Sequence, residues 1–239
     1  MTQVTARPKL RALLLVGGAD YHNQVFHTAE LAGILAAEAG ADLRITDDLS
    51  ALNPSTLGQI DVFVNWSTFV KPTDGQVAAL LAGIENGLGF LGIHAATATF
   101  WSSAPYLTML GSRFIRHDPY KQFIVNVTAP DHPITAGVTD FSVEDELYEI
   151  GGDVAAFPEL AEAVRAGRPN SEIRHLGDGP LGSGLTTLAS AEGHPLLYVK
   201  TYGRGRVHYN ALGHDTKALT HPSVRQLIRQ GLAWVAGRD

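Results

Sequence analysis

The sequence LGFLGIHAAT, residues 88–97, decides the fold. Its first six residues form a short, largely apolar run, which predicts a strand buried on both faces of a sheet. His94 follows within GIHAA, residues 92–96, and small residues two positions away on each side are typical of a nucleophile elbow. A helix after the elbow would direct its first N–H groups at bound negative charge. The alternative is a histidine that merely ends a strand.

The segments before this stretch alternate between strand and helix patterns. Short apolar runs predict strands over 13–16, 43–46 and 61–66, in addition to 88–93. Helical spacing predicts a helix over 26–39 that stops at Gly40, and a second from Thr73 or Asp74 to Glu85, before Gly87. This alternation predicts an α/β fold with a doubly wound, mostly parallel sheet and right-handed crossovers.

The pattern changes after Gly111. Residues 122–128 alternate as a strand does, 196–201 and 206–211 flank the turn YGRG, and 222–235 predicts a last helix. The C-terminal half therefore carries antiparallel additions. Residues 160–166 fit a strand or a helix, and the glycine-rich segment 177–184 is expected to be a loop. With no internal repeat and no domain-sized linker, we expect a single domain over 1–239.

Composition excludes several classes of function. The chain has 239 residues, no cysteine and a formal net charge of −6. Disulfides, thiolate metal sites and cysteine nucleophiles are therefore excluded. The negative charge and the lack of Lys or Arg runs argue against nucleic acid and membrane partners. The apolar run near the N-terminus is too short for a signal peptide, so we expect a cytoplasmic protein.

Histidines follow three of the predicted strands. In an open α/β sheet, ligands bind outside the carboxyl ends of the strands. His22 follows the first strand, His94 the fourth and His214 the strand over 206–211, so we expect them to approach one crevice. Asp215, beside His214, is expected to contact another group, because adjacent residues do not usually face each other. His117 lies in a predicted loop and either reaches the crevice or faces water.

Other residue types suit sugar chemistry. Glu146, within EDELY (144–148), is a candidate acid or base, whereas Glu144 fits a solvated strand end. Trp66 and Trp101 fall near strand ends and either stack on a sugar ring or pack in the core. The segment DHPIT, 131–135, predicts a turn with a structural role despite its histidine.

Five blocks of the sequence resemble the signature blocks of the ThuA-like, or trehalose utilisation, family: 89–97, 131–135, 145–148, 202–207 and 211–215. They occur in the family's order and, with GG at 17–18 and GLAW at 231–234, span nearly the whole chain. The resemblance implies a flavodoxin-like sheet of the class I glutamine amidotransferase type. In that class a cysteine occupies the elbow, which here matches His94, and a catalytic histidine position matches His214. Glutamyl thioester chemistry is therefore excluded.

The resemblance also implies a substrate class. The family is associated with bacterial use of trehalose and related disaccharides, so the expected small-molecule partner is a sugar or 3-keto-sugar. A ketone at C3 acidifies the C2 hydrogen, and a base such as His94 or His214 could then form an enediolate, with cleavage or isomerisation as the outcome. His22, His94, His117 and His214 could hold a divalent metal, zinc, manganese or nickel, that polarises the ketone.

We therefore expect a sugar-active enzyme, with a homodimer as its expected assembly. The catalytic candidates are His94, His214 and Glu146, and the substrate-binding candidates are His22, Trp66, Trp101, His117 and Asp215. One alternative is a catalytically silent sugar-binding or regulatory module, which the two tryptophans keep open. A cofactor-binding protein with 17–18 as its phosphate loop ranks last, because it lacks a spaced third glycine and a Walker lysine.

Overall fold

The computed structural model describes residues 8–19, 24–152, 154, 158–169, 172 and 181–238. Their centre is a nine-stranded sheet of order β2-β1-β3-β4-β11-β10-β9-β6-β7, with a separate antiparallel pair, β5 and β8. The strands are β1 (Arg11–Leu15), β2 (Asp42–Thr46), β3 (Val62–Asn65), β4 (Gly89–Ile93), β5 (Arg113–His117), β6 (Lys121–Val127), β7 (Phe141–Asp145), β8 (Tyr148–Gly151), β9 (Thr186–Ala191), β10 (His194–Tyr202) and β11 (Gly205–Asn210).

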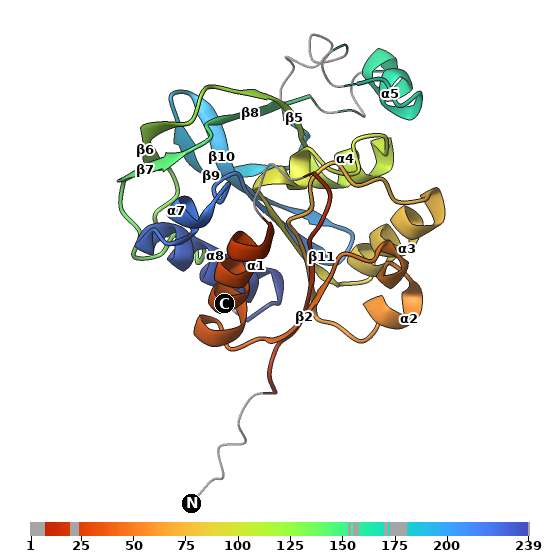
Figure 1. The fold of residues 1–239 in the computed structure, drawn as a ribbon, viewed down its shortest axis with the longest axis horizontal. Coiled ribbons are helices and arrows are strands. Elements are labelled where there is room, and N and C mark those ends of the chain that lie inside the picture. Colours follow the sequence, from red (N-terminus) through yellow and green to blue (C-terminus); the bar gives the residue numbers. More distant parts are fainter. Residues whose placement is uncertain are drawn as a thin grey trace, which may run out of the picture.

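Helices cover both faces of this sheet (Figure 1). One layer contains α1, α7 and α8, and the other contains α2, α3 and α4. The helices are α1 (Gln24–Ala32), which continues as a π-helix (Gly33–Glu38), a 3₁₀ turn (Leu49–Ala51), α2 (Pro54–Leu57), α3 (Asp74–Glu85), η4 (His94–Thr97, 3₁₀), α4 (Ala104–Leu110), α5 (Pro158–Arg165), α7 (Thr216–Leu219) and α8 (Pro222–Val235). No helix among the described residues is long and apolar enough to cross a membrane.

The predicted fold class is confirmed. β2, β1, β3, β4 and β11 are parallel neighbours, whereas β10, β9, β6 and β7 add to them in antiparallel fashion. The first four predicted strands agree with the observed ones to within two residues at each end. Residues 160–166, which fitted either pattern, fall in and just after α5. Leu181 to Gly184 lie outside helices and strands, whereas 177–180 lie outside the described residues.

Local sequence signals fix α3 and the strand beside it. Thr73 caps α3 with a full capping box, since its hydroxyl accepts the Gln76 N–H and the Gln76 side chain accepts the Thr73 N–H. The β10–β11 turn docks against the other end of α3, where the Arg204 N–H donates to the Glu85 carbonyl at 2.9 Å. A Cβ at Gly203 would lie 2.6 Å from that same carbonyl oxygen. The YGRG block therefore positions β11.

β11 brings two segments of the site together. It lies parallel to β4, with Asn210 opposite Ile93, so Ala211 and His94 leave the sheet side by side. Both strands are buried, and their neighbours in the core come from both helix layers. The carboxyl ends of β3, β4 and β11 therefore form one edge, as predicted for a ligand site in this fold.

Candidate active site

His94 occupies a strained turn at the end of β4. Its φ is +45°, a left-handed conformation that is uncommon for a residue other than glycine. A Cβ at Gly92 would lie 3.0 Å from the Ala96 Cβ, so the turn needs small residues on both sides of the histidine. The Tyr209 hydroxyl donates to the His94 carbonyl at 2.9 Å and holds the strained backbone. The elbow geometry is therefore present, but a 3₁₀ turn of four residues follows it in place of the predicted helix.

The imidazole of His94 is wholly buried and has a defined orientation. Its Nδ1 lies 2.7 Å from the Ala211 carbonyl oxygen, which can only accept, so Nδ1 carries a hydrogen. Its ring packs on Tyr148, with centroids 4.0 Å apart. Nε2 is thereby directed at Glu146 Oε2 and at His214 Nδ1, each 3.3 Å away. A carbonyl that fixes the tautomer in this way is the usual support for a metal-binding or proton-transferring histidine.

Asp145 brings Glu146 and His214 together. It ends β7, is wholly buried, and accepts the Gly213 N–H at 2.8 Å and the His214 N–H at 3.3 Å. It also accepts the N–H of Glu146 at 2.8 Å. The loop after β11 is therefore tied to the end of β7. As a result, His214 Nδ1 lies 3.1 Å from Glu146 Oε2.

The charges in this cluster support one another. Burial opposes the ionised form of Glu146, but hydrogen bonds and charge from His214 and His94 outweigh it and hold the pKa of Glu146 well below its ordinary value. Burial likewise opposes protonation of His214, but the hydrogen bond and charge of Glu146, with the charges of Asp145 and Asp215, raise the pKa of His214. Burial raises the pKa of Asp145, whereas the charge of His94 and the N–H bonds to Gly213 and Glu146 oppose that rise.

His117 stands at the edge of the cluster. Its Nδ1 lies 2.7 Å from the Asp118 carbonyl oxygen, so Nδ1 is the donor, and its Nε2 lies 3.5 Å from Glu146 Oε1. The side chain is 37% exposed, unlike the buried His94. Both carboxylate oxygens of Glu146 therefore face histidine nitrogens. His94, Glu146 and His214 each offer a ligand atom within 4.8 Å of the other two, the arrangement that a metal ion requires.

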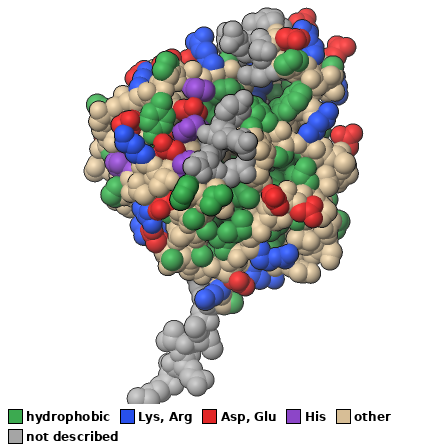
Figure 2. Space-filling model, in the orientation of Figure 1, with side chains coloured by type: hydrophobic (Ala, Val, Ile, Leu, Met, Phe, Trp, Pro, Cys, Tyr) green, Lys and Arg blue, Asp and Glu red, His purple; other side chains and the backbone are tan. Residues whose placement is uncertain are grey.

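The cluster opens into a cavity of about 210 Å³. His117, Glu146, Tyr148 and His214 line it, and histidine and acidic side chains lie close together on the same face of the molecule (Figure 2). The other lining residues are Thr68, Phe69, Ala98 and Phe114.

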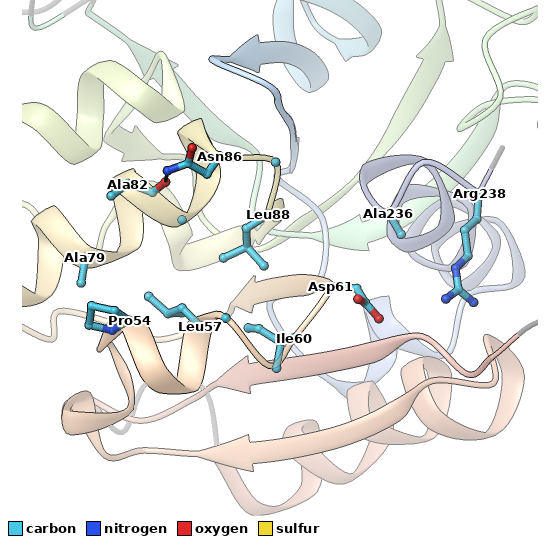
Figure 3. Close-up of a pocket in the computed structure, with 13 residues that line it drawn as sticks. Pro54, Leu57, Ile60, Asp61, Ala79, Ala82, Asn86, Leu88, Ala236 and Arg238 are labelled. Carbon is cyan, nitrogen blue, oxygen red and sulfur yellow. Dashed lines mark hydrogen bonds between the residues drawn. The ribbon is translucent and has the colours of Figure 1, made fainter.

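A larger cavity, about 560 Å³, lies at the opposite, amino edge of the sheet (Figure 3). The charged residues in its wall already have partners. Asp61 pairs with Arg11 at 2.7 Å, and Arg238 donates to the Pro8 carbonyl at 2.7 Å. This cavity is larger, but its charged side chains are occupied by other contacts. We therefore take the histidine and glutamate cluster at the carboxyl edge of the sheet as the candidate site.

The other predicted site residues have different surroundings. His22 lies outside the described residues. Trp66 is 2% exposed in the core, and its indole N–H donates to the Gly213 carbonyl at 3.2 Å, so it supports the loop before His214 instead of offering a ring to a sugar. Asp215 caps α7 by accepting the Ala218 N–H at 2.9 Å, and the Tyr120 hydroxyl donates to its other oxygen. Asp215 therefore contacts another group, as expected of the residue beside His214, and its role in substrate binding stays a prediction. Trp101 lines a second cavity.

Sequence reasoning missed four supporting residues. Asp145 and Tyr209 act through backbone groups of distant segments, and Tyr148 packs under His94. Asp145 and Tyr148 lie in the same EDELY block as Glu146, but the block itself indicates acid–base chemistry only for its glutamates. His27 was also missed: its Nδ1 accepts the Thr216 N–H at 2.9 Å and secures the start of α7. Pairing across such separations has no local sequence signal.

Solved structures share this fold at low sequence identity. A protein from Parabacteroides merdae, named as ThuA-like, matches with a TM-score of 0.75, 17% identity, and coverage of 96% of this chain and 90% of that one. A protein of Salmonella typhimurium, named as cytoplasmic, matches with a TM-score of 0.65 and 12% identity. The match covers 95% of this chain and 99% of that one. A protein from Thermoplasma acidophilum, named as a GMP synthase subunit, matches with a TM-score of 0.56 and 13% identity. The match covers 97% of this chain and 96% of that one. No curated protein sequence matches this chain.

The fold is an α/β fold shared with solved structures named as ThuA-like, and the candidate site has a histidine at the elbow. The family model for ThuA, described as trehalose utilisation, matches residues 11–235. The chain therefore belongs to the ThuA family.

Proposed function

We propose that this protein is a sugar-active enzyme that acts on a glycoside oxidised to a ketone at C3, with a divalent metal held by His94, Glu146 and His214. The observation that carries the proposal is the convergence of His94 Nε2, His214 Nδ1 and Glu146 Oε2, at separations of 3.1–3.3 Å, beside a cavity. The name of the family, trehalose utilisation, supplies the substrate class.

The donor set fits a metal such as zinc, manganese or nickel. Two imidazoles and one carboxylate form a common catalytic set that leaves a position open for substrate. If His94 is neutral, its Nε2 lone pair faces the carboxylate of Glu146, an arrangement that needs a cation or a proton between them. The hydrogen bond from Nδ1 to the Ala211 carbonyl is the support that metal-binding histidines have. A bound metal would supply Lewis-acid polarisation of the ketone.

The chain's own residues would then move the proton. With Nδ1 directed at the Asp118 carbonyl, Nε2 is the nitrogen of His117 that can take up a proton, and the side chain lines the same cavity. We assign His117 to accept the C2 proton, which the neighbouring ketone acidifies. Loss of that proton gives the C2–C3 enediolate. In cleavage, the enediolate electrons form the C1–C2 double bond as the ketone at C3 is restored, the bond from C1 to the leaving oxygen breaks, and that oxygen takes the proton from His117. In isomerisation, the C1–oxygen bond stays intact, the proton returns to C3, and the proton of the C2 hydroxyl passes to the C3 oxygen, which moves the ketone to C2.

Elemental analysis and turnover test the proposal together. The purified protein is expected to contain an equimolar divalent metal and to consume 3-keto-glucosides, and chelation is expected to stop turnover. His94→Ala should lose metal and activity, whereas His117→Ala should keep the metal and lose activity. His194→Ala is the matched control, because that histidine begins β10, outside the cluster. Sugar binding by calorimetry without turnover of any keto-sugar would favour the silent binding module instead.

We also propose that this chemistry takes place in the cytoplasm, because a protein of the same fold carries that description. Fractionation of cells that express the full-length protein tests the location, and recovery of the protein from the periplasm or the medium would contradict it.

A further inference from the structure

A second cavity adjoins the candidate active site. Phe69, Ala98 and Phe114 line both, so the two spaces share a wall. The second cavity has a volume of about 460 Å³. That volume lies within the range of about 300–1,000 Å³ that is usual for small-molecule sites. Its other described lining residues are Thr97, Trp101, Leu107, Arg113, Val164, Gly167 and Pro169.

The lining of this second cavity is mostly apolar. Aromatic and aliphatic side chains dominate it, and the hydroxyl and charged groups come from Thr97 and Arg113. The Thr97 hydroxyl is already within hydrogen-bond distance of the Tyr209 hydroxyl, at 3.0 Å. A second sugar ring would bring several hydroxyl groups into this space, more than the two polar side chains of the described lining, Thr97 and Arg113, can pair with. The composition therefore argues against a disaccharide that extends here.

Two aromatic side chains suit a flat apolar group. Trp101 is partly exposed, and Phe69 is 47% exposed although it is large and apolar. The backbone of Phe69 has φ +54°, and strain of this kind persists where the surrounding structure fixes a residue for a purpose. The N–H of the next residue, Val70, donates to the Thr99 hydroxyl at 3.2 Å and holds that turn. Phe69 therefore offers an aromatic ring to both cavities from a turn whose backbone is held.

We propose that the second cavity is the subsite for the leaving group, and that it takes an aromatic or otherwise apolar aglycone. The substrate class then becomes an aryl or alkyl 3-keto-glycoside: the keto-sugar ring lies at His117, Glu146 and His214, and the aglycone lies against Trp101 and Phe69. This inference rests on the proposed function, because it assigns the sugar to the histidine cavity.

The test compares keto-sugars of three kinds. They are 4-nitrophenyl 3-keto-glucoside, used as both anomers, methyl 3-keto-glucoside and 3-keto-trehalose. The better nitrophenyl anomer should exceed the other two in kcat/KM by about 10- to 100-fold, the value of burying one aromatic ring. Trp101→Ala should remove most of that advantage and leave the methyl glucoside unchanged. Phe26→Ala is the matched control, since that aromatic is 68% exposed on α1 and lines neither cavity.

Binding of unoxidised 4-nitrophenyl glucoside, measured by calorimetry, gives a readout that needs no turnover. Tighter binding than methyl glucoside, lost in Trp101→Ala, supports the subsite even if no keto-sugar is consumed, in which case the proposed reaction alone fails. Val164→Phe narrows the second cavity and is the substitute variant if Trp101→Ala does not fold. It should lower the affinity for 4-nitrophenyl glucoside and leave the affinity for methyl glucoside unchanged. Two results would overturn the proposal. One is a kcat/KM for 3-keto-trehalose equal to or above that for 4-nitrophenyl 3-keto-glucoside, and the other is unchanged binding of 4-nitrophenyl glucoside in the folded variants.

Discussion

Asp145→Asn should loosen the site without touching the proposed ligands. The carboxylate is wholly buried and accepts backbone N–H groups of Gly213, His214 and Glu146. A hydrogen bond to a charged acceptor contributes about 1.5–3 kcal/mol, and a buried N–H left without a partner costs about 1–3 kcal/mol. Asparagine keeps one acceptor oxygen but turns an NH₂ group towards N–H donors. We expect the free energy of unfolding to fall by about 2–4 kcal/mol.

Urea unfolding in the presence of chelator measures that loss without a contribution from metal. The same variant should weaken metal binding by about 10- to 100-fold, the usual effect of removing a group that orients a ligand. Asp140→Asn is the control, because Asp140 also accepts a strand N–H, from Val127 at 2.8 Å, but is exposed. A loss below about 0.5 kcal/mol would refute the reasoning and would indicate that burial keeps Asp145 protonated in the folded protein.

Three further predictions concern the elbow, the metal and pH. Tyr209→Phe removes the hydroxyl that holds the His94 carbonyl and should cost about 1–2 kcal/mol of unfolding free energy in urea, with turnover reduced as well; unchanged turnover would separate the elbow from catalysis. Glu146→Gln should bring the metal content measured by elemental analysis close to zero while the protein stays folded, and a full equivalent of metal in this variant would contradict the donor set. Burial lowers the pKa of His208 to about 4, from about 6.5 in the unfolded chain. Its stabilising contribution to the free energy of unfolding, about 3 kcal/mol, is therefore present above pH 6.5 and is lost as the pH falls towards 4. With chelator present, His208→Leu should show a correspondingly smaller loss over that range, and equal slopes for both proteins would sink the assignment.

Periodicity and end signals predicted the elements well, because each depends on neighbours in sequence. The capping box at Thr73 and the proline that starts α8 are local, and both helices begin where these signals lie. The apolar run that ends at His94 identified β4 and the elbow together. The helix expected after the elbow was wrong: residues 94–97 form only a 3₁₀ turn, followed by the left-handed Phe100, before α4 begins.

Side-chain partners were harder to predict than elements. Trp66 illustrates the difficulty, since a tryptophan near a strand end fits a sugar platform and a core position equally well, and only the fold shows its N–H bonded to Gly213. Asp215 is similar, because a residue that follows a histidine and precedes a short helix is also a natural N-cap. Both residues hold the loop around His214 in place, so they serve the site through its backbone.

The arrangement around His94 explains how the strained turn after β4 accommodates a histidine. An imidazole there needs room for its ring and a partner for its second nitrogen. The fold supplies both, because β11 ends beside β4 and gives the Ala211 carbonyl to Nδ1, and Tyr148 covers the ring. Nε2 then lies where Glu146, fixed through Asp145, can face it. The imidazole at the elbow is therefore held by residues from several strands, Tyr148 on β8, Tyr209 on β11 and Glu146 after β7.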